Sequence, residues 1–391
     1  MFLISFVLIA LLVNESNEAK YLTAKLLYPA NNIFAFEFGV GQPKMVIEGR
    51  IEQTMNISVI SPYTYSVKTS RTATFIQNET VKITHNPTNL SLYLDDISIE
   101  DKSSKIMFYL FPPKNSYDIK KNRIGFSLKV NEESVSFIHQ LKKNGKISKL
   151  QYSFNPTSNS EEGLFYIGGI PNDVINKNKY KAELKVNTNY SYWSVNLTKI
   201  HFDNITFDNT HIAYFDSGND YIYLPEEYYN TLDITYFERF QNDCSKVSFF
   251  EVLFMFVCNV EILSELPPFT FEFNDYEISI EAYRLFTYLD GNYVLDMRKN
   301  SGNNNIILGG KFLKHFISTF DYENKKVTLY SDINPIIYKG KDPRLNYMPI
   351  IYLICSVISF MGIFAMVLVY LMNKNCFIRV NIEIHNEESN K

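Results

Sequence analysis

A short motif in the second half of the chain combines the residue types that hold a single reactive carboxylate. Residues 213–225 read AYFDSGNDYIYLP, so Asp216, Ser217 and Gly218 lie between two apolar runs. A glycine lets backbone N–H groups approach a carboxylate, and a serine hydroxyl adds a further hydrogen bond. The motif therefore predicts an ionisable aspartate fixed at a tight turn between two strands, although such turns are also common in ordinary β-proteins.

The segments around this motif occur in a characteristic order. An entry strand with a Gly-x-Gly-x-Pro turn spans residues 34–43, a strand and a short helix span 122–154, and the motif EEGLFYIGGIPND begins at Glu161. An Ile-Leu-Gly strand and a closing hairpin follow at 306–330. In this order and spacing, residues 33–331 resemble the pepsin-like aspartic peptidases.

The resemblance implies a mainly β, bilobal fold. Its N-lobe would span about residues 33–160 and its C-lobe about residues 161–331. Strand-type alternation of apolar and polar residues dominates both halves, and FIHQLKKNGK from Phe137 is the clearest short helix.

The first lobe departs from the family at the position of its catalytic aspartate. Counting from the Gly-x-Gly-x-Pro turn, the Asp-Thr-Gly of the family falls on Glu52, Gln53 and Thr54. No Asp-Ser-Gly or Asp-Thr-Gly occurs elsewhere in that lobe. By resemblance, the catalytic pair would be Asp216 and Glu52, supported by Ser217, Gly218, Gln53 and Thr54.

This departure matters because the family cleaves peptide bonds with two carboxylates that share one proton around a water molecule. Glu52 keeps a carboxylate but adds a methylene, and a misplacement of about 1 Å can cost on the order of 100-fold in rate. Thr54 replaces a glycine, Met55 replaces a hydroxyl residue that would bond the carboxylate, and Gln53 replaces a threonine that connects the lobes. Peptidase activity is therefore expected to be lost or weakened.

Two further expectations concern the elements around the site. Each carboxylate turn should be paired with a later strand ending in glycine, namely Gly125 for Glu52 and Gly309 for Asp216. The resemblance also places His85 on the hairpin flap that covers the substrate.

The length and composition of the chain indicate a folded domain with a large hydrophobic core. The chain has 391 residues, of which 46% are hydrophobic, and a net charge of −4. This balance, without a block of lysine and arginine, argues against nucleic acid as a partner. The six histidines lack metal-ligand spacing, so no metal and no cofactor are expected.

The two ends of the chain predict its cellular location. The apolar run within residues 1–19 indicates a signal peptide, and residues 348–372 contain no charge and could cross a bilayer as a helix. Residues 332–347 would be a juxtamembrane linker, and 373–391 a cytosolic tail. We therefore expect a single-pass type I membrane protein of the secretory pathway or cell surface, with its large domain luminal or extracellular.

Cysteine and asparagine usage fit that location. The family resemblance implies a disulfide between Cys244 and Cys258, which an oxidising compartment would allow. A sequon at Asn56 lies beside the Glu52 turn, and whether it carries a glycan is left open. The glycosylation candidates are Asn78, Asn89, Asn189, Asn196 and Asn204.

Three functions remain compatible with the sequence. The first is a membrane-anchored homologue of these peptidases, with little or no activity, whose cleft binds a peptide or protein. The second is an active endopeptidase with an unusual pair formed by Glu52 and Asp216. The third is a structural or adhesive ectodomain.

Overall fold

The computed structural model describes most of the chain. The described residues are 20–28, 33–83, 86–111, 121–130, 135–157, 162–208, 210–232, 234, 237–249, 253–289, 291–300, 302, 304–339 and 356–372. The chain divides into two compact units, Met1–Tyr338 and Lys339–Lys391.

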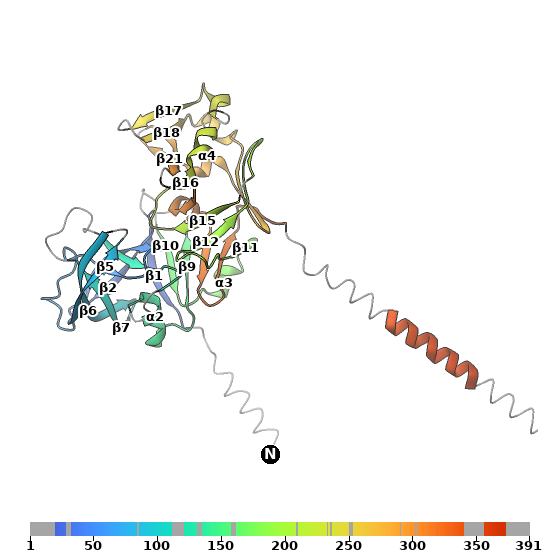
Figure 1. Cartoon of the computed structure of the whole chain (residues 1–391), viewed down its shortest axis with the longest axis horizontal. Coiled ribbons are helices and arrows are strands. Elements are labelled where there is room, and N and C mark those ends of the chain that lie inside the picture. The colour runs from blue at the N-terminus through green and yellow to red at the C-terminus, as the bar shows by residue number, and fades with distance from the viewer. Residues whose placement is uncertain are drawn as a thin grey trace, which may run out of the picture. The chain divides into compact units, whose positions relative to one another are not determined.

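A 13-stranded sheet runs through the first unit and carries one of the two carboxylate turns. Figure 1 shows its strands β1, β9 and β10 between the strand groups of the two halves. Its order is β11 (Tyr180–Lys185), β26 (Lys326–Ser331), β25 (Ile317–Asp321), β9 (Gln151–Pro156), β10 (Glu162–Ile167), β1 (Leu22–Leu27), β2 (Ala35–Val40), β3 (Met45–Glu52), β8 (Asn122–Gly125), β4 (Val59–Ile60), β7 (Lys102–Leu110), β6 (Asn86–Ile99) and β5 (Thr74–Ile83).

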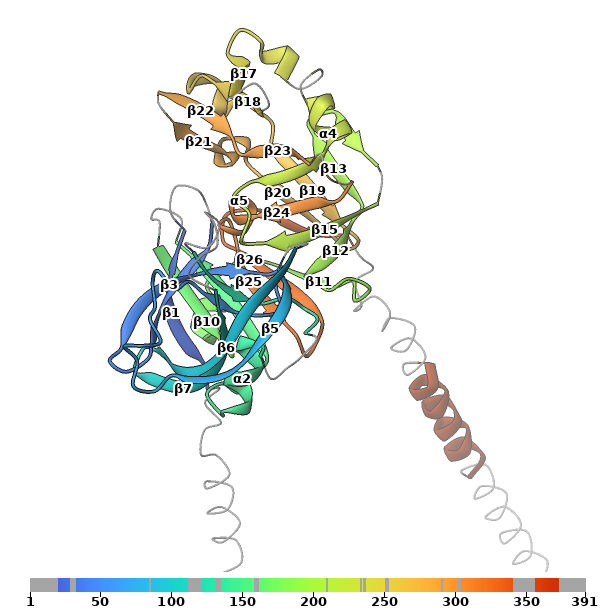
Figure 2. The same ribbon diagram turned by 60° about the vertical axis from the view of Figure 1, so that its left-hand side comes forward.

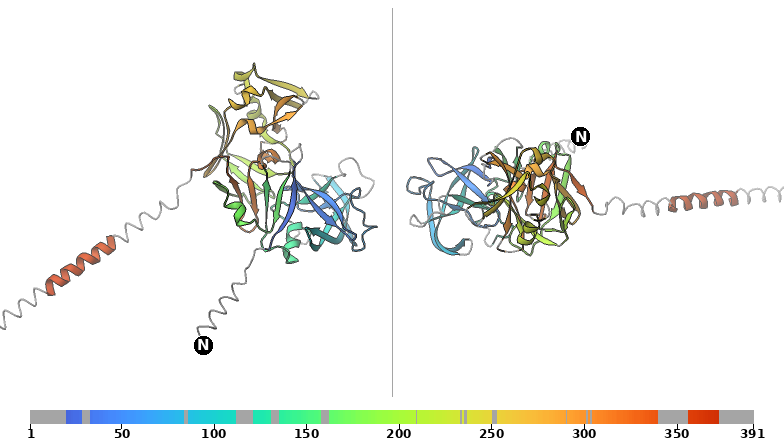
Figure 3. Two further views of the ribbon diagram at one scale, coloured as in Figure 1. Left: turned by 180° about the vertical axis from the view of Figure 1, so that it is seen from behind. Right: turned by 90° about the horizontal axis from the view of Figure 1, so that it is seen from above.

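Three smaller sheets build the C-terminal half of this unit, which Figure 2 shows in green to orange, apart from the blue and cyan strands of the N-terminal half. The first consists of β12 (Ser194–Leu197), β15 (His211–Asp216), β24 (Ile306–Gly309), β16 (Ile222–Pro225) and β23 (Met297–Asn300). The second consists of β14 (Ile205–Phe207), β13 (Lys199–Phe202), β19 (Phe269–Phe273), β20 (Tyr276–Ile280) and β27 (Ile336–Tyr338). The third, clustered at one end of the unit in Figure 3, consists of β17 (Cys244–Phe249), β18 (Leu253–Cys258), β22 (Asn292–Leu295) and β21 (Phe286–Leu289).

Helices are short within the first unit. Among its described residues, the α-helices are α2 (Phe137–Lys143), α3 (Asn172–Ile175), α4 (Glu226–Thr231) and α5 (Gly310–Leu313). The 3-10 helices are η3 (Phe237–Phe240), η4 (Glu261–Ser264) and η5 (Ala282–Leu285). The mainly β fold and the helix from Phe137 therefore agree with the sequence prediction.

The folded unit is larger than the predicted range 33–331. Strand β1 precedes that range and pairs with β10 and β2. Strand β27 lies within residues 332–347, expected to be a linker, and pairs with β20. Neither short segment could be predicted locally, because each is completed by hydrogen bonds to strands distant in sequence.

The expected membrane span is not supported. Residues 356–372 form a helix, while 348–355 lie outside the described residues. Within the part of the chain that the structure describes, no helix is long and apolar enough to cross a membrane. The predicted signal peptide, residues 1–19, and tail, 373–391, also lie outside the described residues.

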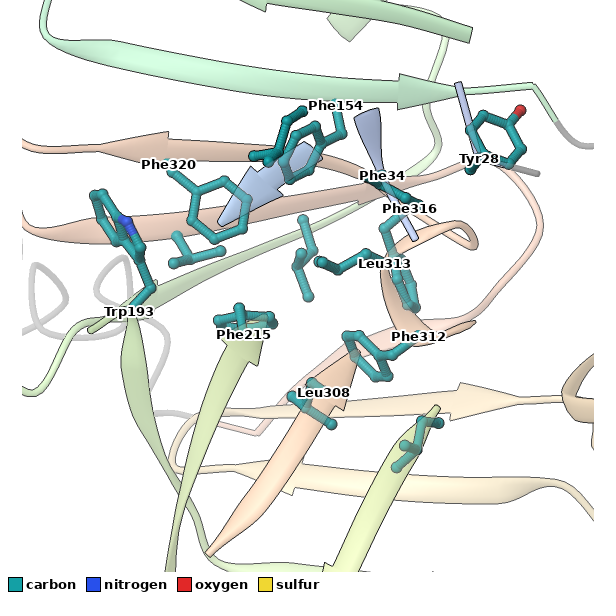
Figure 4. Packing of buried hydrophobic residues seen from close by; sticks show 14 of the residues in the cluster. Tyr28, Phe34, Phe154, Trp193, Phe215, Leu308, Phe312, Leu313, Phe316 and Phe320 are labelled. Carbon is teal, nitrogen blue, oxygen red and sulfur yellow. The ribbon is translucent and has the colours of Figure 1, made fainter. Parts of the chain in front are cut away.

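An aromatic core connects the central sheet with the strand that leads to Asp216. The ring of Phe320 lies 5.6 Å from Phe154, 5.3 Å from Trp193 and 5.7 Å from Phe215, centroid to centroid. Figure 4 labels these four side chains. All four side chains are fully buried, and each such burial stabilises the fold by about 1.5–3 kcal/mol. The contact with Phe320 holds Phe215 in place, and this also positions Asp216, the next residue.

The predicted disulfide between Cys244 and Cys258 is confirmed. The two residues are opposite each other in the antiparallel pair β17–β18, and their sulfurs are bonded at 2.02 Å. The bond closes a loop with a sequence separation of 14 residues in the small third sheet.

Replacing both Cys244 and Cys258 by serine is expected to lower the free energy of unfolding by about 3 kcal/mol, because the loop gains conformational entropy in the unfolded chain. Urea denaturation of the full chain measures this loss, with Cys376→Ser as the thiol control. An unchanged urea midpoint would show that strand pairing alone holds this loop.

Candidate active site

Asp216 ends strand β15 and is almost fully buried, at 4% exposure. Its Oδ1 accepts a hydrogen bond from the backbone N–H of Gly218 at 3.1 Å, and its Oδ2 accepts one from Nδ2 of Asn219 at 2.6 Å. Burial, and then the negative charge of Glu52, raise the pKa of Asp216 to about 7 against these donors. The hydrogen bonds from Gly218 and Asn219 therefore position the carboxyl group of Asp216. This group nevertheless holds a proton at a higher pH than the carboxyl group of an exposed aspartate does.

Glu52 ends strand β3, is 7% exposed, and lies beside the Asp216 turn. A Cβ atom placed on Gly218 would lie 2.5 Å from Oε2 of Glu52 and 3.1 Å from Oδ1 of Asp216. Both carboxylates therefore border the same space above Gly218, which only a glycine leaves open. The structure thus brings together the two acidic residues that the sequence singled out.

Two arginines flank Glu52, a contact that the motifs of the sequence do not predict. Nε of Arg50 lies 2.9 Å from Oε1 of Glu52, and Nε of Arg123 lies 4.0 Å from the same oxygen. Arg50 and Glu52 share one face of β3, and Arg50 is opposite Arg123 in the parallel pair β3–β8. The alternation along β3, and the pairing of Arg50 with Arg123 on β8, could have revealed both contacts.

The arginines give the two carboxylates different roles. Burial raises the pKa of Glu52, while the charges of Arg50 and Arg123 oppose that rise. Among the described residues, Asp216 forms no ion pair with a cation, and the charge of Glu52 raises its pKa further. Glu52 is therefore the member of the pair that ionises first, and Asp216 retains the proton.

The turns that carry the two carboxylates are directly connected. Oε1 of Gln53 accepts a hydrogen bond from the backbone N–H of Ser217 at 2.8 Å, and its Nε2 donates to the hydroxyl of Tyr152 at 2.8 Å. The hydroxyl of Ser217 donates to the carbonyl of Ile51 at 3.1 Å. The replacement of a threonine by Gln53 was expected to weaken the connection between the two turns. Gln53 nevertheless connects them, because its side chain reaches the backbone of Ser217.

The two halves of the site share one backbone plan. In parallel strand pairs, Glu52 is opposite Gly125 and Asp216 is opposite Gly309, which confirms the expected pairing. A Cβ on Gly125 would lie 2.6 Å from the carbonyl oxygen of Met55. A Cβ on Gly309 would likewise lie 2.8 Å from the carbonyl oxygen of Asn219.

Met55 and Asn219 therefore occupy equivalent positions. Asn219 donates to Asp216, whereas the thioether of Met55 has no hydrogen to donate. The exposed Thr54 takes the position of Gly218. Glu52 is thus flanked by the guanidinium groups of two arginines. Asp216 instead accepts hydrogen bonds from a backbone amide and a side-chain amide.

The remaining predicted residues lie apart from this pair. His85 lies outside the described residues, so its role as flap residue stays a prediction. Asn56 is half-buried, which leaves its glycosylation open. Among the glycosylation candidates, Asn196 is half-buried in β12, and four are exposed: Asn78, Asn89, Asn189 and Asn204.

Arg50→Met is expected to lower the free energy of unfolding by about 2 kcal/mol at pH 7. Removing one partner of a buried ion pair costs about 3–5 kcal/mol, and the 21% exposure of the Arg50 side chain reduces that cost. Without Arg50, the pKa of Glu52 rises further, so the loss should shrink at pH 4, where Glu52 takes up a proton. Urea denaturation at both pH values measures this, with the exposed Arg71→Met as control. An equal loss at pH 4 and pH 7 would contradict the ion pair as its cause.

Comparisons with known proteins relate one part of this site to a family. The eukaryotic aspartyl protease family matches residues 122–331, a range that contains Asp216 but not Glu52. Plasmepsin I of Plasmodium falciparum, from each of two isolates, is 29% identical over 198 residues, which is 48% of this chain and 40% of plasmepsin I. The chain is thus matched to less than half the length of these curated relatives. The carboxylate pair on two equivalent glycine-backed turns, together with the family match over half of the chain, shows that this protein belongs to the eukaryotic aspartyl protease family.

Proposed function

We propose that this chain binds a peptide or protein ligand above Glu52 and Asp216, and that its peptidase activity is lost or weak. The observation that carries the proposal is the ion pair between Oε1 of Glu52 and Nε of Arg50 at 2.9 Å. A catalytic carboxylate of this family must be free to share a proton and a water molecule with its partner.

The chemistry of an ion-paired glutamate supports weak catalysis. An arginine beside a carboxylate stabilises its ionised form, which makes that carboxylate a weaker base toward a water molecule. The added methylene moves the carboxylate relative to an aspartate, and Met55 cannot donate a hydrogen bond that would reposition it. Each change on its own could cost on the order of 100-fold in rate through misplacement.

The charge at the site supports a preference for acidic ligands. Arg50 and Arg123 supply two positive charges next to Glu52, and their side chains are 21% and 20% exposed. When Asp216 carries its proton, the positive charges are in excess. A glutamate or aspartate side chain of a bound peptide could pair with the guanidinium groups in bidentate geometry.

The test is cleavage of a random peptide library by the full chain from pH 3 to pH 7. We expect no cleavage by the natural protein or by Asp216→Asn, and a gain of cleavage in Glu52→Asp combined with Arg50→Val. Fluorescence polarisation with pools of acidic and basic decapeptides tests binding, where the acidic pool should bind more tightly. Cleavage by the natural protein that vanishes in Asp216→Asn would overturn the proposal.

That outcome would establish the second candidate function, an endopeptidase with a Glu52–Asp216 pair. The observation that favours it is the proton distribution: Asp216 retains a proton to about pH 7 while Glu52 ionises first. One protonated and one ionised carboxylate is the state that peptide hydrolysis by this family requires.

We further propose that the protein folds in an oxidising compartment of the secretory pathway. The disulfide between Cys244 and Cys258 supports this location, because such bonds persist in secreted and luminal proteins. The exposed sequons at Asn78, Asn89, Asn189 and Asn204 suit it as well. Endoglycosidase treatment of the cellular protein tests the location by a gel shift, and alkaline carbonate extraction of the same sample tests the predicted membrane attachment. A protein without a shift and with a reduced Cys244 would contradict the location.

A further inference from the structure

A cavity of about 840 Å³ lies in the first unit and is separate from the carboxylate pair, since neither Glu52 nor Asp216 lines it. Its walls come from the end of β9, the residues after α3, helix η5, the residues after α5, and the turn after β26. This volume is within the roughly 300–1,000 Å³ range of sites that hold small organic molecules.

The walls of this cavity carry an excess of positive charge. The cationic lining residues are Lys177, Arg284, Lys311 and Lys314, and Asp332 is the one carboxylate among the lining residues described. Lys311 is already compensated, because its Nζ lies 2.5 Å from Oδ2 of Asp296 and donates to the carbonyl of Phe286 at 3.0 Å. Because Asp296 also acts on Lys314, the four lining cations are opposed by two carboxylates, Asp296 and Asp332.

His315 adds a polar group that the protein leaves unsatisfied. Its Nε2 atom is buried and has no hydrogen-bond partner, while the ring also bonds to the backbone of Arg284. Burial, then the charges of Lys311, Lys314 and Arg284, hold the pKa of His315 well below 6.5. Burial likewise lowers the pKa of Lys314 to about 8. Burial is the larger cause of both shifts, and the neighbouring cations lower both pKa values further, an effect that a bound anion would oppose.

Aromatic side chains line the same cavity. Tyr28, Phe286 and Phe316 belong to its walls, and Figure 4 shows Tyr28 and Phe316 near each other. The hydroxyl of Tyr28 donates to the carbonyls of Thr157 and Glu162 at 2.8 and 2.7 Å. The Tyr28 ring packs against Phe34, with 5.5 Å between the centroids, and forms part of the apolar wall of the cavity.

We propose that this cavity binds a small organic anion, with a phosphate or carboxylate group beside Arg284, Lys314 and His315 and an apolar body against Tyr28 and Phe316. Because Nε2 of His315 is buried, it contacts the anion only after the lining side chains shift, and it donates a hydrogen bond once it carries a proton. Arg284 and Lys314 supply the charge, as in other sites for phosphate and carboxylate groups.

Proton uptake should accompany binding at this site. The charged or titratable groups around His315 are Arg284 on η5, Lys311 and Lys314 at α5, Asp296 before β23, Tyr330 and Asp332 at the end of β26, and Lys177 after α3. An anion raises the pKa of Lys314 and of His315 by opposing the repulsion between cations. Affinity should therefore increase as the pH falls from 8.5 to 6.5.

Titration calorimetry of the full chain with phenyl phosphate tests the proposal. Phenyl phosphate and benzoate should bind more tightly than phenol, which lacks the charge, and more tightly than inorganic phosphate, which lacks the ring. Runs in buffers of different ionisation enthalpy should show net proton uptake near pH 7.5. A comparison of phenyl phosphate with benzoate decides which anionic group the site prefers.

Variants locate the site. Lys314→Gln should weaken phenyl phosphate binding by about tenfold, since it removes one charged contact. Lys177→Glu, an exposed position, serves as a second variant whose folding is not at risk and should also weaken binding. The exposed Lys143→Gln and the active-site variant Asp216→Asn should leave binding unchanged, which separates this site from the proposed function. Absence of phenyl phosphate binding at millimolar concentration, or equal binding by Lys314→Gln and Lys143→Gln, would overturn the proposal.

Discussion

Gly309→Ala is expected to prevent the chain from folding or to lower its free energy of unfolding by about 4 kcal/mol or more, which places it among the largest effects of a single substitution. The added Cβ would lie 2.1 Å from the carbonyl oxygen of Tyr221 and 2.8 Å from that of Asn219. Both contacts are with backbone atoms, so no side chain can rotate away. The φ of Gly309 is −76°, which any residue adopts, so the entire cost is steric.

The equivalent glycine of the first lobe should behave in the same way. A Cβ on Gly125 would lie 2.4 Å from the carbonyl oxygen of Ile57. Gly302→Ala is the control, because its nearest neighbour would be 3.7 Å away. Yield of soluble protein, circular dichroism and urea denaturation measure the effect. A Gly309→Ala protein with the urea midpoint of Gly302→Ala would show that the turn at Asp216 can move away from β24.

Asp216→Asn is expected to stabilise the protein at pH 8 and to leave its stability at pH 4 nearly unchanged. The pKa of Asp216 is raised from 3.8 to about 7 in the folded chain. Between these values the folded state holds a proton that the unfolded state has released, so stability falls as the pH rises from about 4 to 7. Above pH 7 the natural protein carries a buried charge next to Glu52 that asparagine removes.

The gain at pH 8 should be about 2–4 kcal/mol, from a difference of about three pKa units at 1.36 kcal/mol per unit, less the hydrogen bonds lost to Gly218 and Asn219. Urea denaturation across pH 4 to 8 gives the profile, and the exposed Asp275→Asn is the control. A parallel profile for the natural protein and Asp216→Asn would mean that Asp216 titrates as an exposed aspartate does.

The order of short motifs along the chain predicted the backbone of the site. The spacing from Gly-x-Gly-x-Pro to Glu52, and from Asp216 to Gly309, is fixed by strands that must pair in parallel with a later glycine. These pairings can be read from sequence because a Cβ at Gly125 or Gly309 would enter the facing backbone. The disulfide between Cys244 and Cys258 follows from the family resemblance, and the structure shows the two cysteines opposite each other in the β17–β18 pair.

The side-chain contacts around Glu52 could not be predicted from the same motifs. Arg50 is ordinary as a sequence position, and its contact with Glu52 arises only because both residues face one side of β3. The side chain of Gln53 is long enough to reach the backbone of Ser217. The replacement of a threonine by a glutamine does not by itself indicate this contact. The cationic cavity assembles residues from Tyr28 to Asn334, so no local pattern could reveal it.

Gln53 also has a dynamic consequence. Its one amide group is bonded at both ends, to the Ser217 backbone and to Tyr152 on β9. A hinge motion that separated the two carboxylate turns would leave two buried polar groups without partners, at a cost of about 1–3 kcal/mol each. The turns should therefore move together, and the Ser217 amide should exchange its hydrogen slowly. Catalytic loss in this chain would then arise from the chemistry of one carboxylate, within a site whose two halves stay aligned.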